Sequence, residues 1–230
     1  KALMKDLLGD QVDLENMPFY GLAEVKVAGR SCVISQSGFS GEAGYEIYLR
    51  DATLYADEMW NAVLEAGKKH NLMVIAPAHH RRIQAGILSW GQDMDQQHNP
   101  YQCNLGYQVS LSGKGEWNKT SDYVGKAALE KMGKELKDGK KPYALQLVGF
   151  EMGGKPIDDY APDFWLISNE SGGDPVGFIT SPWWHPEKKT NIAMGYVPFD
   201  GTLNANGFPK GKVGTKYKVH LPEKYSDTPG

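Results

Sequence analysis

Short extended runs separated by glycine and proline are the feature that most constrains how this chain can fold. Between residues 21 and 49, apolar and polar residues alternate in three runs, LAEVKVAG, SCVISQSGF and YEIYL, with glycines around them. A period of two is typical of strands that bury one face, so we predict a small sheet here. Glycine supplies 27 of the 230 residues, which indicates many turns rather than long helices.

Helical spacing of apolar residues is confined to four segments. These are residues 2–8, 52–69, 77–89 and 125–136. Asp51 is the predicted N-cap of the second segment. The apolar run LMVIA, which precedes the third segment, predicts one more short strand.

The chain changes character beyond Pro142. Five short β-rich runs follow, YALQLVGFE, DFWLISN, PVGFITS, NIAMGYVP and TKYKVHL, separated by Gly, Pro and Asp turns. Such spacing is typical of a small antiparallel barrel or sandwich. A polar, lysine-rich stretch at residues 112–141 predicts the boundary, with one domain at residues 1–138 and a second at residues 142–230. The expected fold class is therefore α+β.

Charge and cysteine content exclude several function classes. The 25 Lys and Arg residues against 28 Asp and Glu residues leave a net charge of −3, so we expect neither a nucleic-acid nor a membrane partner. Cys32 and Cys103 have no metal-ligand spacing, so we predict no disulfide framework, no metal site and a cytoplasmic location. The start at Lys1, which resembles the middle of a helix, and the loop-like end YSDTPG predict a fragment.

The segment SGFSGEAGYEIYL contains the first candidate site. Alternation along its strand puts Glu46 and Tyr48 on one face and Tyr45, Ile47 and Leu49 on the other. A glutamate partly removed from water accepts two N–H bonds from a planar heterocycle such as a pterin or purine. The alternative is an edge strand with a solvated Glu46, which is the commoner situation for a strand glutamate.

Other candidate residues are aromatic or basic. His79 and His80 begin a predicted helix. Neighbouring residues on a helix point about 100° apart, so these two histidines cannot form a metal-binding face together. They are candidates for binding a ligand, and the alternative is that they are partly exposed at the start of the helix. Trp90 is a candidate for stacking on a flat ligand, with Asp93 orienting it, or else a core residue beside a helix cap. The segment TSPWWHPE, with Trp184, is predicted as a loop that closes a pocket or fills an interdomain seam.

Taken together, these motifs resemble the glycine-cleavage T-protein family. GFSGEAGYEIYL resembles the family's folate-binding strand, and RRIQAGILSWGQDM resembles its Arg-Leu-Glu-Ala-Gly helix with Tyr-Gly-x-Asp. NPYQCNLGYQVSL, DYVGKAAL and VGFITSPWWHPEKKTNIAMGYV follow in the family's order and spacing. The resemblance implies a remnant of the folate-binding α/β domain of the T-protein fold, followed by a small antiparallel β-barrel.

The resemblance also implies a chemistry. Family members that resemble this chain bind tetrahydrofolate and move a one-carbon unit to its N5, so tetrahydrofolate is the expected cofactor. Glu46 matches the glutamate that holds the pterin, and Phe39, Trp90 and Trp184 are the further cofactor-binding candidates. The catalytic candidates are Tyr48, His79 and His80, since transfer from an aryl ether needs a proton donor.

Two departures from the T-protein pattern indicate a branch of the family. Phe39 stands where a tyrosine is usual, and Pro77-Ala78-His79 replaces Ala-Arg-Asp. The segment resembles the folate-dependent demethylases, whose small-molecule methyl donor is a sulfonium or a methoxy-aromatic acid. The alternatives are aminomethyl transfer in glycine cleavage, which needs a lipoyl carrier protein as partner, and a non-catalytic folate-binding module. The resemblance further implies a missing N-terminal region of the same protein, without which we expect weak or absent turnover.

Overall fold

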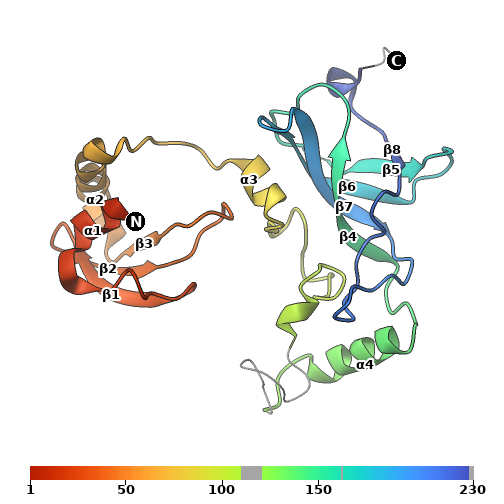
Figure 1. Cartoon of the computed structure of the whole chain (residues 1–230), viewed down its shortest axis with the longest axis horizontal. Helices are drawn as coiled ribbons and strands as arrows, with labels where there is room; N and C mark the ends of the chain where they lie inside the picture. Colours follow the sequence, from red (N-terminus) through yellow and green to blue (C-terminus); the bar gives the residue numbers. More distant parts are fainter. Residues whose placement is uncertain (110–120, 162, 228–230) are drawn as a thin grey trace. The chain divides into compact units, whose positions relative to one another are not determined.

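The computed structural model describes residues 1–109, 121–161 and 163–227. The chain folds into two compact units, Lys1–Ile87 and Leu88–Gly230 (Figure 1). The domain boundary expected at residues 138–142 stays a prediction. Part of the lysine-rich stretch, residues 112–120, lies outside the described residues, as does the end of the motif NPYQCNLGYQVSL.

The first unit is a three-stranded antiparallel sheet with two helices packed on it (Figure 1). Its elements are α1 (Ala2–Leu8), η1 (Gly9–Gln11), β1 (Leu22–Val27), β2 (Arg30–Ser35), β3 (Glu46–Leu49), α2 (Ala52–Gly67), η2 (Lys68–His70) and α3 (His79–Gln84). The strand order β1-β2-β3 confirms the predicted sheet. Its core combines one face of the sheet with side chains of α1 and α2, namely Met4, Leu8, Leu14, Val25, Val27, Cys32, Ile34 and Met59.

The second unit is dominated by a curled five-stranded antiparallel sheet (Figure 1). Its elements are η3 (Gly106–Gln108), α4 (Lys126–Lys137), β4 (Leu145–Met152), β5 (Trp165–Asn169), β6 (Gly177–His185), β7 (Thr190–Pro198), β8 (Tyr217–Val219) and η4 (Glu223–Tyr225). The strand order β4-β7-β6-β5-β8 leaves β4 and β8 as the two edges. The predicted α+β class with a small antiparallel barrel is confirmed, in the form of a half-barrel whose edges do not pair.

Local predictions for residues 72–89 were wrong in two respects. Residues 72–76 form no strand among the described residues, and Met73 and Ile75 are 77% and 69% exposed. A strand needs a neighbouring strand to complete its backbone hydrogen bonds, and this segment pairs with none in the described part of the chain. The helix expected at residues 77–89 covers only His79–Gln84, and Gly86 with φ +72° follows its end.

Two predictions at element ends also need correction. Asp51 does precede α2, but its side chain makes no capping hydrogen bond and its backbone is left-handed, with φ 53°. The segment TSPWWHPE is not a loop, because Thr180–His185 belongs to β6 and Pro182 pairs with Ala193. A register shift between Ile179 and Ser181 accommodates this proline within the strand.

Candidate functional site

Strand β3 separates its side chains between two faces as the alternation predicts. Tyr45, Ile47 and Leu49 pack against the core of the first unit. Glu46 and Tyr48 lie on the opposite face and are exposed. β3 pairs with β2 only, with Ser35 opposite Glu46, so the candidate site lies on an edge strand. The Glu46 side chain is not removed from water as expected, because no described element of this unit covers that face.

A hydrogen-bonded cluster nevertheless surrounds the Glu46 carboxylate. Its Oε2 accepts a short hydrogen bond from the Ser37 hydroxyl and a second one, of 3.0 Å, from the Tyr48 hydroxyl. Ser37 is only 9% exposed, so the carboxylate is held from the interior of the unit. The conformation of Glu46 is therefore defined by its neighbours, although the residue is exposed.

The carboxylate controls the acidity of Tyr48. Its hydrogen bond to Glu46, with a smaller contribution from desolvation, raises the pKa of the Tyr48 phenol. The physical cause is that the bond is donated by the protonated phenol and a second negative charge beside the carboxylate is unfavourable. Tyr48 thus stays protonated at neutral pH with its proton directed to Glu46, which makes it a poor acid toward any other group.

The loop between β2 and β3 is packed on α3. Gly41 has φ +74°, and a Cβ added there would overlap the Ala85 Cβ, so only glycine permits this approach. On the same loop, the Phe39 ring centroid is 5.9 Å from the Arg82 Cζ. Arg82 is 1% exposed, whereas Phe39 is 47% exposed and presents its ring to solvent. The loop thus packs on α3 and exposes the Phe39 ring to solvent.

The two candidate histidines begin α3. His79 and His80 are half-buried on its first turn, and each has a polar or ring partner. Among the described residues, no group of three or more His, Cys, Asp or Glu side chains is arranged to hold a metal ion. In the same residues no helix is long and apolar enough to cross a membrane.

Trp90 and Trp184 belong to the second unit. Trp90 is 67% exposed on the turn formed by residues 88–95, so it is not a core residue. Trp184 is half-buried in β6, and its backbone N–H donates to the Ile157 carbonyl at 2.8 Å. The structure thus brings Glu46 and Tyr48 into direct contact and places Phe39 on the loop beside α3, while the tryptophans lie on the other unit.

Asp93 anchors the turn that carries Trp90. Its carboxylate is 1% exposed and accepts the hydroxyls of Thr180 and Ser181 at 2.5 Å each and the Ser89 N–H at 2.9 Å. The expected helix cap is therefore a turn fixed to β6. This geometry supports Trp90 indirectly and gives Asp93 no exposed atom for a ligand.

Ser37 is the residue that the sequence interpretation missed. It lies two positions beyond Ser35, the residue that pairs with Glu46, so its place next to the carboxylate depends on the β2–β3 register. Only the correct β2–β3 register would have indicated that Ser37 lies beside Glu46, because a serine before a glycine-rich loop is common in sequences.

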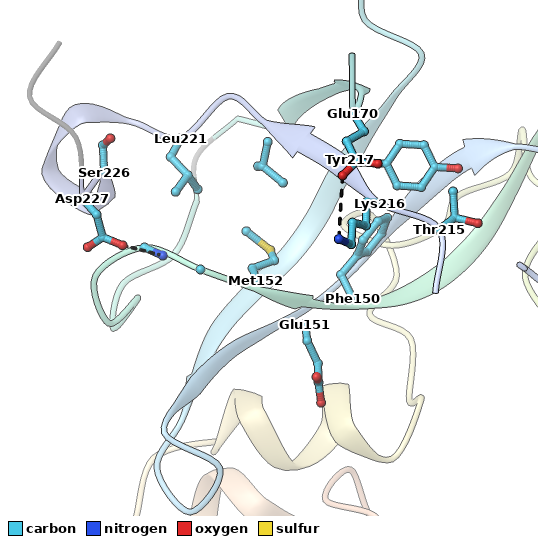
Figure 2. Close-up of a pocket in the computed structure, with 13 residues that line it drawn as sticks. Phe150, Glu151, Met152, Glu170, Thr215, Lys216, Tyr217, Leu221, Ser226 and Asp227 are labelled. Atoms are coloured by element: carbon cyan, nitrogen blue, oxygen red, sulfur yellow. Dashed lines mark hydrogen bonds and ion pairs between the residues drawn. The ribbon is translucent and has the colours of Figure 1, made fainter. Parts of the chain in front are cut away.

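A separate cavity of 530 Å³ lies between the unpaired edges β4 and β8 (Figure 2). Phe150, Met152, Tyr217 and Leu221 supply its apolar lining. Two of its polar groups already have partners, since the Lys216 Nζ is 3.8 Å from the Glu170 Oε1 and the Asp227 Oδ2 accepts the Gly154 N–H at 3.1 Å. None of the predicted site residues lines this cavity, so it is not the candidate site.

Comparisons with known proteins agree with the fold. The sequence model of the GCVT N-terminal domain family matches residues 1–113. The aminomethyltransferase of Halothermothrix orenii is 30% identical over 191 residues, covering 82% of this chain and 48% of that protein. The dimethylsulfoniopropionate demethylase DmdA of Ruegeria pomeroyi is 32% identical over 197 residues, covering 85% and 48%.

A solved structure shows the same architecture. The glycine cleavage system aminomethyltransferase T from Bartonella henselae superposes with a TM-score of 0.60 at 21% identity, covering 86% of this chain and 48% of that one. The chain thus spans about half the length of the curated relatives it matches. Taken together, the family model and the relatives confirm the resemblance to the glycine-cleavage T-protein family, and the solved structure shows the same fold.

Proposed function

We propose that this chain carries the pterin-binding part of a tetrahydrofolate-dependent one-carbon transferase, with Glu46 as the residue that holds the pterin. The carrying observation is an exposed glutamate whose Oε2 is fixed by Ser37 and Tyr48 while its Oε1 has no hydrogen-bond partner among the described residues. A carboxylate accepts hydrogen bonds only, and the pyrimidine edge of a pterin offers N–H donors. The exposed Phe39 ring adds a flat apolar surface on the neighbouring loop. The residues present therefore fit the ring they would bind.

Tetrahydrofolate supplies the nucleophilic N5 that receives the carbon. The protein residues contribute orientation, because transfer requires N5 to lie in line with the departing group. Glu46 sets the position of the ring, and Phe39 on the neighbouring loop is the proposed ring contact. Trp90 and Trp184, which belong to the second unit, stay ring contacts predicted from the sequence. Tyr48, His79 and His80 are proposed to act near the one-carbon donor.

For the donor, we favour a methylated sulfonium over a methoxy-aromatic acid. With tetrahydrofolate bound, a sulfonium would need no acid: the N–C bond would form as the C–S bond breaks, the electron pair would stay on sulfur as a neutral thioether, and the N5 proton would leave to solvent. An aryl ether needs a proton on its oxygen, and the Tyr48 proton is already donated to Glu46. The similarity to a dimethylsulfoniopropionate demethylase supports the same choice.

Aminomethyl transfer is the second candidate. It is favoured by the similarity to aminomethyltransferases such as that of Halothermothrix orenii. This reaction takes its carbon from an aminomethyl group on a lipoyl carrier protein and releases ammonia. Its product, methylene-tetrahydrofolate, separates it from demethylation, which yields 5-methyl-tetrahydrofolate.

The first experiment tests pterin binding by calorimetry with tetrahydrofolate. Glu46→Ala is expected to weaken binding at least about tenfold, because a hydrogen bond to a charged group contributes about 1.5–3 kcal/mol. Glu42→Ala is the matched control, since Glu42 is an exposed glutamate on the loop that precedes β3, four residues before Glu46. Saturable binding that is equal in wild type and Glu46→Ala, or no saturable binding at all, would refute the proposal.

The second experiment identifies the reaction in the full-length protein. Tetrahydrofolate is supplied with dimethylsulfoniopropionate, with vanillate or syringate, or with an aminomethyl-loaded lipoyl carrier, and the folate product is resolved by chromatography. We expect 5-methyl-tetrahydrofolate from the sulfonium. Methylene-tetrahydrofolate with ammonia would instead establish aminomethyl transfer. Binding without product from any donor would establish a non-catalytic folate-binding module.

A further inference from the structure

The two oxygens of the Glu46 carboxylate differ in their surroundings. Oε2 accepts both hydroxyl hydrogen bonds, from Ser37 and from Tyr48. Oε1 has no hydrogen-bond partner among the described residues. A carboxylate oxygen has about two lone-pair sites, so Oε2 is fully occupied and Oε1 is available. Oε2 is thus used by the protein, and Oε1 is available to accept a hydrogen bond from a ligand.

Of the two hydroxyls, that of Ser37 is the fixed one. Ser37 is 9% exposed and lies two residues beyond the end of β2, while Tyr48 is 54% exposed on the edge strand. A short buried side chain has few alternative rotamers, whereas an exposed phenol turns toward solvent at little cost. The orientation of the carboxylate therefore depends more on Ser37 than on Tyr48.

We infer that Ser37 is a positioning residue of this site: it holds Oε2 from the interior of the unit and leaves Oε1 as the oxygen that accepts the ligand N–H. This inference rests on the proposed function of Glu46. It also changes how Glu46 is expected to bind the ligand. For both carboxylate oxygens to accept ligand N–H groups, Ser37 or Tyr48 would have to give up its hydrogen bond to Oε2. The ligand class that fits is a reduced pterin bound through one carboxylate oxygen.

The binding test compares three serine variants by calorimetry with tetrahydrofolate. Ser37→Ala removes the hydroxyl and is expected to weaken binding about tenfold, since a misaligned charge-assisted bond loses most of its strength. Ser37→Thr keeps the hydroxyl and is expected to restore binding to within about threefold of wild type. Ser31→Ala is the control, because Ser31 is exposed on β2 and its hydroxyl makes no hydrogen bond among the described residues.

A double-mutant cycle shows whether Ser37 acts through Glu46. In the Glu46→Ala background, Ser37→Ala is expected to have no further effect on binding. If wild type binds tetrahydrofolate and Ser37→Ala binds it with the same affinity, the inference is overturned and the proposed function stays in place. Equal binding in wild type and Glu46→Ala, or none in wild type, refutes the proposed function instead.

A measurement without ligand tests whether the Ser37 hydroxyl lies within the cluster that Glu46 and Tyr48 form. The Ser37 hydroxyl lowers the pKa of Tyr48, opposing the larger effect of Glu46, so Ser37→Ala is expected to raise that pKa further. The titration is followed by NMR of ¹³Cζ-labelled tyrosine, with the Tyr48 signal assigned from Tyr48→Phe. A Tyr48 titration identical in wild type and Ser37→Ala overturns the inference whether or not tetrahydrofolate binds.

Discussion

Replacement of Asp93 tests how the second unit holds the turn that carries Trp90. Asp93→Ala removes the carboxylate that accepts the buried hydroxyls of Thr180 and Ser181 and the part-buried Ser89 N–H. Thr180 has an alternative, because its hydroxyl is also 3.2 Å from the Met194 carbonyl. The other two lose bonds to a charged group whose own side chain is 1% exposed.

The expected magnitude follows from those two bonds. Each is of the kind that contributes about 1.5–3 kcal/mol, and partial relaxation or water entry reduces the sum, so we expect Asp93→Ala to lower the free energy of unfolding by about 3 kcal/mol. Asp93→Asn keeps the shape and one oxygen but must turn its amide N–H₂ toward one donor. It therefore loses about half as much, about 1.5 kcal/mol.

Urea denaturation, followed by tryptophan fluorescence and circular dichroism together, measures both losses. Asp95→Ala is the control: Asp95 lies two residues away, but its carboxylate is 45% exposed and pairs with His98 at 2.8 Å. We expect it to cost less than about 1 kcal/mol. Hydrogen exchange of the Ser89 amide is expected to accelerate in Asp93→Ala only. The reasoning is refuted if Asp93→Ala and Asp95→Ala destabilise equally, or if Asp93→Asn costs as much as Asp93→Ala.

Two further predictions concern the first unit. Gly41→Ala is expected to lower its free energy of unfolding by about 1–3 kcal/mol, because the new Cβ overlaps that of Ala85 and φ is +74°, whereas Gly38→Ala, with nothing within 4 Å, should change it by less than about 1 kcal/mol. Thermal unfolding of the two variants checks this, and equal melting temperatures would contradict the packing of the loop on α3. For pH, Lys5 and then Lys1 lower the pKa of Glu15 from 4.5 to about 2. The native state thus prefers the ionised form, so this contribution to stability is present above pH 4.5 and is lost as the pH falls toward 2. Glu15→Gln is expected to flatten that part of the pH–stability curve, and a curve with unchanged slope would show that the pairs contribute nothing.

Much of the local structure followed from side-chain periodicity. α2, α4 and the strands of both sheets lie where the spacing of apolar residues predicts them. The failures occurred where formation depends on a partner. Residues 72–76 have the composition of a strand but pair with no strand in the described part of the chain, and Thr180–His185 has the proline of a loop but pairs with β7. Periodicity describes what a segment can bury, and it carries no information on whether a neighbour is present.

The candidate site divides in the same way. Alternation along β3 was sufficient to place Glu46 and Tyr48 on one face, because successive side chains in any strand point to opposite sides. Tertiary structure alone decided that this face is open to solvent and that Ser37 reaches the carboxylate, since both depend on which strands pair and in what register. The assignment of one carboxylate oxygen to the protein and the other to a ligand is therefore a property of the folded sheet.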